Sequence, residues 1–325
     1  MPDAFFPPLG PDRFRATELT RGPWDPGLQH AGPPAALLGR AIEAHGDRKD
    51  LRVARITFDI TRPVPIAELT VATRTLRGGR SVELVEATLH SGNTELMRAT
   101  ALRIRTAELG RGEELGRGGE RGRGGELGRG GEGGRGGELG RGRERGPAAE
   151  PVPPAERGRP AERGRPAQRG RPAELGLPAE LVPGARLPGP AAGRVEPFFP
   201  TGQEVGYHTA MEFRFVAGSF LELGPATVWM RMRHPLAHGE PPSPLCRVLI
   251  AADSGNGVSA ALDFRTWRFI NPDLTIYLLR YPAGEWVALE ASTTAADGVG
   301  LADTTLHDEQ GRIGRSAQAL FIDRR

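Results

Sequence analysis

Cysteine, lysine and long apolar runs are scarce in this chain of 325 residues. Cys246 is the single cysteine and Lys49 is the single lysine. One cysteine excludes an intramolecular disulfide and favours a reducing compartment, so we expect a cytoplasmic protein. No run approaches the ~18 apolar residues of a membrane span, and the N-terminus lacks the basic start and apolar core of a secretory signal. The sequence therefore predicts no membrane partner.

Aromatic residues are absent from residues 107–195, which repeat motifs such as ELGRGGE and then PAERGRP. A segment with so few apolar side chains cannot bury enough surface to offset the entropy that is lost on ordering. We therefore predict a disordered linker between two domains, residues 1–106 and 196–325.

Excess positive charge is confined to this linker. The whole chain has 43 Lys and Arg against 40 Asp and Glu, a net charge of +3. The linker holds 17 arginines and 13 glutamates, a net of +4, which leaves 26 basic and 27 acidic residues, a net of −1, in the two domains. Because the arginines alternate with glutamates and have no aromatic neighbours for base stacking, no nucleic-acid partner is expected.

Both domains show a buried helix followed by four strands. In the first domain HAGPPAALLGRAIEAHG predicts a helix after Pro33 and Pro34. In the second, strands at 210–218 and 226–235 come before a helix that ends at Asp253. The strands that follow the two helices are predicted at 52–64, 68–76, 80–90 and 95–105, and at 266–280, 285–293, 298–308 and 312–323. This order is typical of an α+β fold with a sheet packed on a central helix.

Asp253 lies at the end of an apolar helix and is followed at once by Ser-Gly-Asn-Gly. The glycines are ordinary helix-stop residues, but a carboxylate in the last turn faces the negative end of the helix dipole. One interpretation is an Asx-type cap of the turn. The other is a functional carboxylate whose position is set by chemistry.

The second domain resembles the acyl-CoA thioesterase II family of double hotdog proteins in the order helix–Asp253, NPDLTIYLLRYPAGEW and GRSAQAL. The first domain is similar to that family in GPWDPGLQHAGPPAALLGRAIEA and in the strands from ARITFDI onward. The resemblance covers about 1–106 and 203–325. It implies two tandem hotdog domains, each a central helix wrapped by a curved antiparallel sheet, and the two sheets joined.

The family resemblance also implies hydrolysis of acyl-CoA thioesters by a hydrogen-bonded trio of Asp, Thr or Ser, and Gln, without a covalent acyl-enzyme, a metal or another cofactor. By residue type and position the trio falls on Asp253, Asn271 and Gln318. Asn271 departs from the pattern because it has amide donors in place of a hydroxyl. Thr275, two pleats along the same predicted strand face, is the less favoured substitute.

Three further residues are candidates for substrate binding. The turn at Gly255 and Gly257 would leave room for the acyl chain beside the backbone. His30 is placed where related thioesterases carry His-Gly-Gly, so it either lines the pocket or only begins the first helix. Acyl-CoA is the expected partner, and self-association through the hotdog sheets is left open.

Two other functions compete with hydrolysis. In a non-catalytic acyl-CoA-binding or assembly protein, Asn271 would mark a lost active site. A hotdog hydratase or dehydratase needs an Asp–His pair, and we expect no histidine near Asp253. A serine hydrolase is disfavoured because the chain has no Gly-x-Ser-x-Gly elbow.

Overall fold

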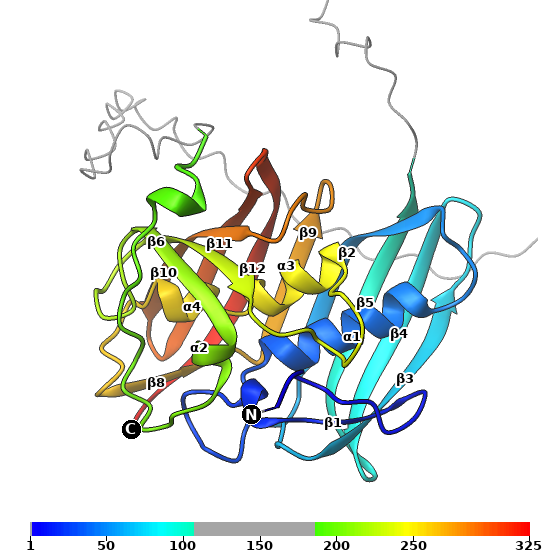
Figure 1. The fold of residues 1–325 in the computed structure, drawn as a ribbon, viewed down its shortest axis with the longest axis horizontal. Coiled ribbons are helices and arrows are strands. Elements are labelled where there is room, and N and C mark those ends of the chain that lie inside the picture. Colours follow the sequence, from blue (N-terminus) through cyan, green and yellow to red (C-terminus); the bar gives the residue numbers. More distant parts are fainter. Residues whose placement is uncertain (1, 107–185) are drawn as a thin grey trace, which may run out of the picture. The chain divides into compact units, whose positions relative to one another are not determined.

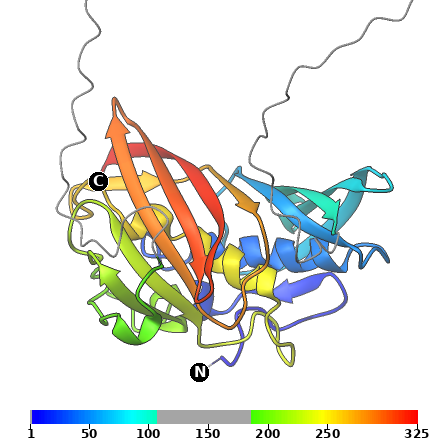
Figure 2. The same cartoon turned by 90° about the horizontal axis from the view of Figure 1, so that it is seen from above.

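The computed structural model describes residues 2–106 and 186–325. These residues belong to one compact unit. Two helices, α1 (Gly32–Ala44) and α3 (Pro244–Ala252), lie on the inner side of a curled antiparallel sheet (Figures 1 and 2). Within the described residues no helix has both the length and the apolar character needed to cross a bilayer. Most of the predicted linker, residues 107–185, lies outside the described residues.

The sheet has 12 strands and runs through both halves of the chain in the order β1-β3-β4-β5-β2-β9-β12-β11-β10-β7-β6, with β8 paired to β12. The two halves join where β2 pairs with β9, from Arg55 opposite Tyr277 to Asp59 opposite Asp273. The first half contributes β1 (Arg13–Arg15), β2 (Leu51–Ile60), β3 (Glu68–Arg77), β4 (Val82–Ser91) and β5 (Thr94–Arg105). The second half contributes β6 (Met211–Ala217), β7 (Ala226–Met232), β8 (Trp267–Ile270), β9 (Asp273–Leu278), β10 (Val287–Ala296), β11 (Val299–Asp308) and β12 (Gly311–Arg324). Among the described residues, four short helices complete the fold: η1 (Glu18–Thr20), η3 (Pro190–Ala192), α2 (Tyr207–Ala210) and α4 (Gly255–Val258).

The two long helices pack antiparallel, so that each begins where the other ends. Glycine makes this approach possible at two positions of α1. A Cβ on Gly32 would lie 2.4 Å from the Ile250 carbonyl oxygen, and one on Gly39 would lie 2.1 Å from the Leu249 side chain. The first turn of α1 therefore contacts the last turn of α3. This contact builds the site described below.

The strand predicted over 266–280 is two strands, and this corrects the sequence prediction. β8 ends at Ile270 and pairs with β12, whereas β9 begins at Asp273 and pairs with both β2 and β12. Pro272 separates them, because it has no N–H to donate to a ladder. Its carbonyl oxygen instead accepts from the Ile60 N–H at 2.7 Å. Asn271 thus lies in a corner between two strands. Because it belongs to neither strand, the alternation of side chains along a strand does not fix the direction of its side chain.

The last residues of the predicted linker, 186–195, are folded onto the second half, so the predicted boundary at residue 195 lies too far along the chain. Leu187 is buried, and the Pro188 carbonyl accepts from the Trp229 indole N–H at 2.8 Å. Arg194 then forms a bridge with Phe215 of β6. These contacts depend on tertiary neighbours, which the local Pro- and Gly-rich composition does not reveal.

Candidate functional site

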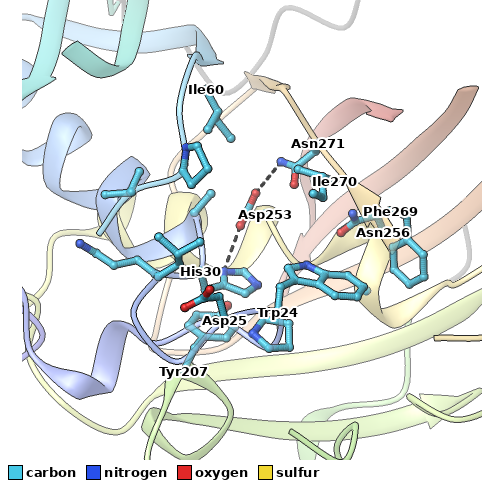
Figure 3. Close-up of a pocket in the computed structure, with 18 of the residues that line it drawn as sticks. Trp24, Asp25, His30, Ile60, Tyr207, Asp253, Asn256, Phe269, Ile270 and Asn271 are labelled. Atoms are coloured by element: carbon cyan, nitrogen blue, oxygen red, sulfur yellow. Dashed lines mark hydrogen bonds and ion pairs between the residues drawn. The ribbon is translucent and has the colours of Figure 1, made fainter. Parts of the chain in front are cut away.

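A cavity of about 370 Å³ opens where the C-terminal end of α3 meets the N-terminal end of α1 (Figure 3). Asp253, Asn271 and His30 lie on its wall. The rest of the wall is mainly apolar and rich in aromatic rings, namely Trp24, Phe198, Phe199, Phe220, Phe269 and Phe321. A cavity of this size with a few convergent polar groups is typical of a small-molecule site.

The position of Asp253 is explained by the antiparallel helices. It caps the C-terminus of α3, where the dipole of that helix disfavours a carboxylate, but it faces the N-terminus of α1, where the dipole favours one. Its side chain is only 4% exposed. One oxygen, Oδ1, accepts a hydrogen bond of 2.8 Å from Asn271 Nδ2, and the other, Oδ2, lies 3.0 Å from His30 Nδ1. Figure 3 shows both contacts as dashed lines.

Gln318 contacts Asp253 from behind the cavity wall. It is buried on β12, and its Nε2 donates to the Asp253 carbonyl oxygen at 3.1 Å and to Oδ1 at 3.5 Å. Its Oε1 accepts from the Asn256 backbone N–H at 3.1 Å. Gln318 therefore ties the end of α3 to α4 and does not itself line the cavity.

His30 lies beside Asp253, which corrects the expectation that no histidine is near this carboxylate. The imidazole stacks on the ring of Tyr207, with centroids 3.8 Å apart and planes at 8°. The Tyr207 hydroxyl in turn donates to the Ile250 carbonyl at 2.7 Å and lies 2.9 Å from Ser254 Oγ. Burial raises the pKa of Tyr207 far above its ordinary value, so the phenol stays protonated and supports the histidine ring.

Of the remaining predicted residues, only Gly257 lines the cavity. The Thr275 hydroxyl bonds to Thr57 across the β2–β9 seam at 3.2 Å and does not line the cavity. Gly257 lines the cavity, whereas Gly255 lies outside the lining residues. A Cβ on Gly255 would lie 2.7 Å from Thr304 Oγ1, so this glycine allows α4 to pack on the sheet.

Several residues of the cavity were not found from the sequence. Tyr207, Ser254 and Asn256 also line it, and the aromatic wall comes from segments far apart along the chain. The only local signal is the pair Phe198 and Phe199 at the start of the second domain. Among the described residues no group of three His, Cys, Asp or Glu side chains is arranged to hold a metal ion.

Two family models match the chain in order. The acyl-CoA thioesterase N-terminal domain matches residues 20–104, and the acyl-CoA thioesterase C-terminal domain matches residues 189–322. No curated protein matches the chain.

Solved structures share the architecture over nearly the whole chain. A protein described as a thioesterase II from Thermobifida fusca is 17% identical to this chain and superposes on it with a TM-score of 0.61. The superposition covers 99% of this chain and 96% of the Thermobifida fusca chain. A hotdog protein from Alicyclobacillus acidocaldarius is 14% identical with a TM-score of 0.58, covering 99% and 97%. An acyl-CoA thioesterase II from Mycobacterium marinum is 12% identical with a TM-score of 0.53, covering 98% and 96%.

At these identities the structural neighbours establish the fold, and the matched domain models establish the family. Each domain model matches the chain once, one before and one after residues 105–188. Each match covers one half of the joined sheet. The chain belongs to the acyl-CoA thioesterase II family of double hotdog thioester hydrolases.

Proposed function

We propose that the cavity at Asp253 is the active site and that it hydrolyses acyl-CoA thioesters by direct attack of water. The observation that carries this proposal is a buried carboxylate held at the edge of an apolar, aromatic-lined cavity. The apolar wall suits an acyl chain, and the carboxylate lies where the polar end of that chain would enter. The thioester carbonyl and the attacking water then meet beside Asp253.

Asp253 and Asn271 divide the work of placing the water. The Asn271 amide donates to Oδ1 and so fixes the plane of the carboxylate. The carboxylate fixed in this way positions the attacking water, directly or through a side chain that it orients, so that a lone pair of the water oxygen faces the carbonyl carbon. Gln318 keeps the carboxylate in place from behind. In this arrangement an amide supplies the donor that a hydroxyl supplies elsewhere in the family.

Asn256 is the best-placed donor for the carbonyl oxygen as negative charge develops there. Asn256 lies on the cavity wall (Figure 3). Its backbone N–H donates to Gln318 Oε1, which holds this residue in place. A preorganised amide of this kind is worth about 2.7–4 kcal/mol in acyl-transfer transition states. Attack by water followed by loss of the CoA thiolate requires no covalent acyl-enzyme.

Turnover of an acyl-CoA panel with a thiol-trapping reagent tests the proposal. We expect release of free CoA from at least one chain length, and loss of that activity in Asp253→Asn. Binding of acyl-CoA without turnover would contradict hydrolysis and favour the non-catalytic acyl-CoA-binding function.

The contact between His30 and Asp253 supplies the pair that a hotdog hydratase would need. The same panel therefore includes trans-2-enoyl-CoA, whose absorbance falls on hydration. Faster loss of the enoyl absorbance than release of thiol would favour hydration over hydrolysis.

A further inference from the structure

His30 Nδ1 lies within hydrogen-bonding distance of two groups that make opposite demands on it. It is 3.0 Å from Asp253 Oδ2, and the Gly32 N–H points at it from 3.1 Å. An imidazole nitrogen has one in-plane position, which holds either a proton or a lone pair. Nδ1 therefore donates to the carboxylate or accepts from Gly32, but it cannot do both.

The first turn of α1 explains why both partners converge on this nitrogen. Pro33 and Pro34 have no N–H, and the Ala35 N–H is taken by the Ala31 carbonyl. Gly32 thus supplies the one backbone N–H of this turn that remains, and it points at His30 Nδ1. The helix end that faces the carboxylate is consequently poor in donors, and a donor from a side chain is needed.

Charge decides between the two partners. A lone pair on Nδ1 would repel a carboxylate oxygen at 3.0 Å, and Asp253, at 4% exposure, has little water to replace the lost bond. Hydrogen bonds to a charged acceptor are about twice as strong as neutral ones. We propose that His30 carries its proton on Nδ1, donates it to Asp253, and uses the unprotonated Nε2 as the base that takes the proton from the attacking water.

Exposure and packing support this division of roles. Both carboxylate oxygens of Asp253 already have side-chain partners, whereas the His30 side chain is 14% exposed and lines the cavity. The stacked Tyr207 ring holds the imidazole plane, so Nε2 keeps one direction. His30 is therefore the more accessible base, and Asp253 is the group that orients it and stabilises its charged form.

This inference rests on the proposed function, because it assigns the proton of the same hydrolysis. The water oxygen bonds to the thioester carbon while its proton moves to Nε2, and Asp253 stabilises the imidazolium that forms. The C–S bond then breaks with its electron pair on sulfur, and Nε2 returns the proton to the CoA thiolate. The products are the carboxylic acid and the CoA thiol, and the enzyme is unchanged.

Nitrogen-15 NMR of the histidine side chains tests the proton position independently of activity. The chain has 7 histidines, and the His30→Gln spectrum identifies the signals that belong to His30. We expect the neutral Nδ1–H form in the wild type and a change to Nε2–H in Asp253→Asn, because Nδ1 then accepts from Gly32. A wild-type ring protonated at Nε2, alone or together with Nδ1, at the assay pH would overturn the base role.

Steady-state kinetics test whether His30 acts as the base. His30→Gln and His30→Asn are expected to lower kcat about 10²-fold with little change in KM, the size of effect typical of a lost general base. The double variant His30→Gln/Asp253→Asn should be no slower than the slower single variant, because the pair acts as a unit. His45→Gln is the matched control, since His45 bonds to Thr73 and Thr75 outside the cavity.

The outcomes separate this inference from the proposed function. An active wild type whose His30→Gln variant is equally active overturns the inference alone. A wild type that hydrolyses no acyl-CoA overturns both. Melting temperatures of the variants identify any loss of kcat that comes from unfolding.

Discussion

The two ends of the antiparallel helix pair offer a comparison within one molecule. At one end Asp253, which caps α3, meets the first turn of α1. At the other end Glu43, in the last turn of α1, accepts a short hydrogen bond of 2.5 Å from Ser243, the N-cap of α3. Each end therefore places a carboxylate opposite the N-terminus of the other helix.

The surroundings of the two carboxylates differ. The Asp253 end has a cavity of about 370 Å³ walled by aromatic rings, whereas the Glu43 end has one of about 200 Å³ lined by Lys49, Arg52 and Arg103. Three cationic side chains suit an acyl chain less well than a wall of aromatic rings, because burying a charge beside the chain is costly. The duplicated fold thus provides two carboxylates, and the aromatic wall together with the Asn271 amide distinguishes the one that is suited to thioester chemistry.

The largest expected effect on turnover comes from removing the charge of Asp253, and the same change at Glu43 provides the comparison. Asp253→Asn keeps the size of the side chain and removes its charge, so we expect turnover of acyl-CoA to fall by ~10²-fold or more. Glu43→Gln is the matched control and should retain wild-type turnover. Comparable losses in both variants would show that the two ends are equivalent, contrary to the comparison.

Asn271 has the next largest expected effect. Removing its amide in Asn271→Ala deletes the 2.8 Å hydrogen bond to the Asp253 carboxylate. A hydrogen bond to a charged group contributes about 1.5–3 kcal/mol, so kcat should fall about 10- to 100-fold. Asn271→Thr restores the residue type usual in the family and should retain or raise activity. An Asn271→Ala enzyme as fast as the wild type would remove this residue from the mechanism.

The pH dependence of stability is a smaller effect, specific to the Glu43 end. Burial raises the pKa of Glu43 above its ordinary value, although the hydrogen bond from Ser243 opposes the shift. The folded protein therefore binds this proton more tightly than the unfolded chain, and stability falls as the pH rises from about 4.3 through the raised pKa. Glu43→Gln should melt at a higher temperature than the wild type near pH 7.

Thermal melts of the wild type and of Glu43→Gln across this pH range check the sign of the pH dependence of stability. The advantage of Glu43→Gln is expected to shrink as the pH falls through the raised pKa to about 4.3 and to change no further below it. A difference between the two proteins that does not vary with pH would contradict the assignment to Glu43.

The smallest effect is expected for residues 107–185. The two halves are joined by the β2–β9 pairing and by the α1–α3 contact, which do not involve this segment. Its composition predicts no contribution to the core. Replacing it with a Gly-Ser linker that still reaches both halves should leave the melting temperature and turnover nearly unchanged. A loss of several degrees would show that the segment stabilises the folded halves.

Periodicity in the sequence predicted both helices and most strands, because burial on one face leaves a local pattern. The break at Asn271 and Pro272 was missed, although Pro272 marks the corner and the buried apolar positions shift there from Phe269 to Leu274 and Ile276. His30 was considered, but its pairing with Asp253 was not. That contact arises from the antiparallel packing of α1 on α3, and no local pattern specifies which helix ends meet.

The central claim is that water, activated beside Asp253, attacks the thioester directly. A single turnover in ¹⁸O-labelled water, with enzyme in excess over acyl-CoA, tests it most directly. We predict that the released fatty acid carries one ¹⁸O atom from the first turnover. Unlabelled acid would mean that an oxygen atom of the enzyme, such as one from the Asp253 carboxylate, was transferred through a covalent intermediate, and this would contradict the account.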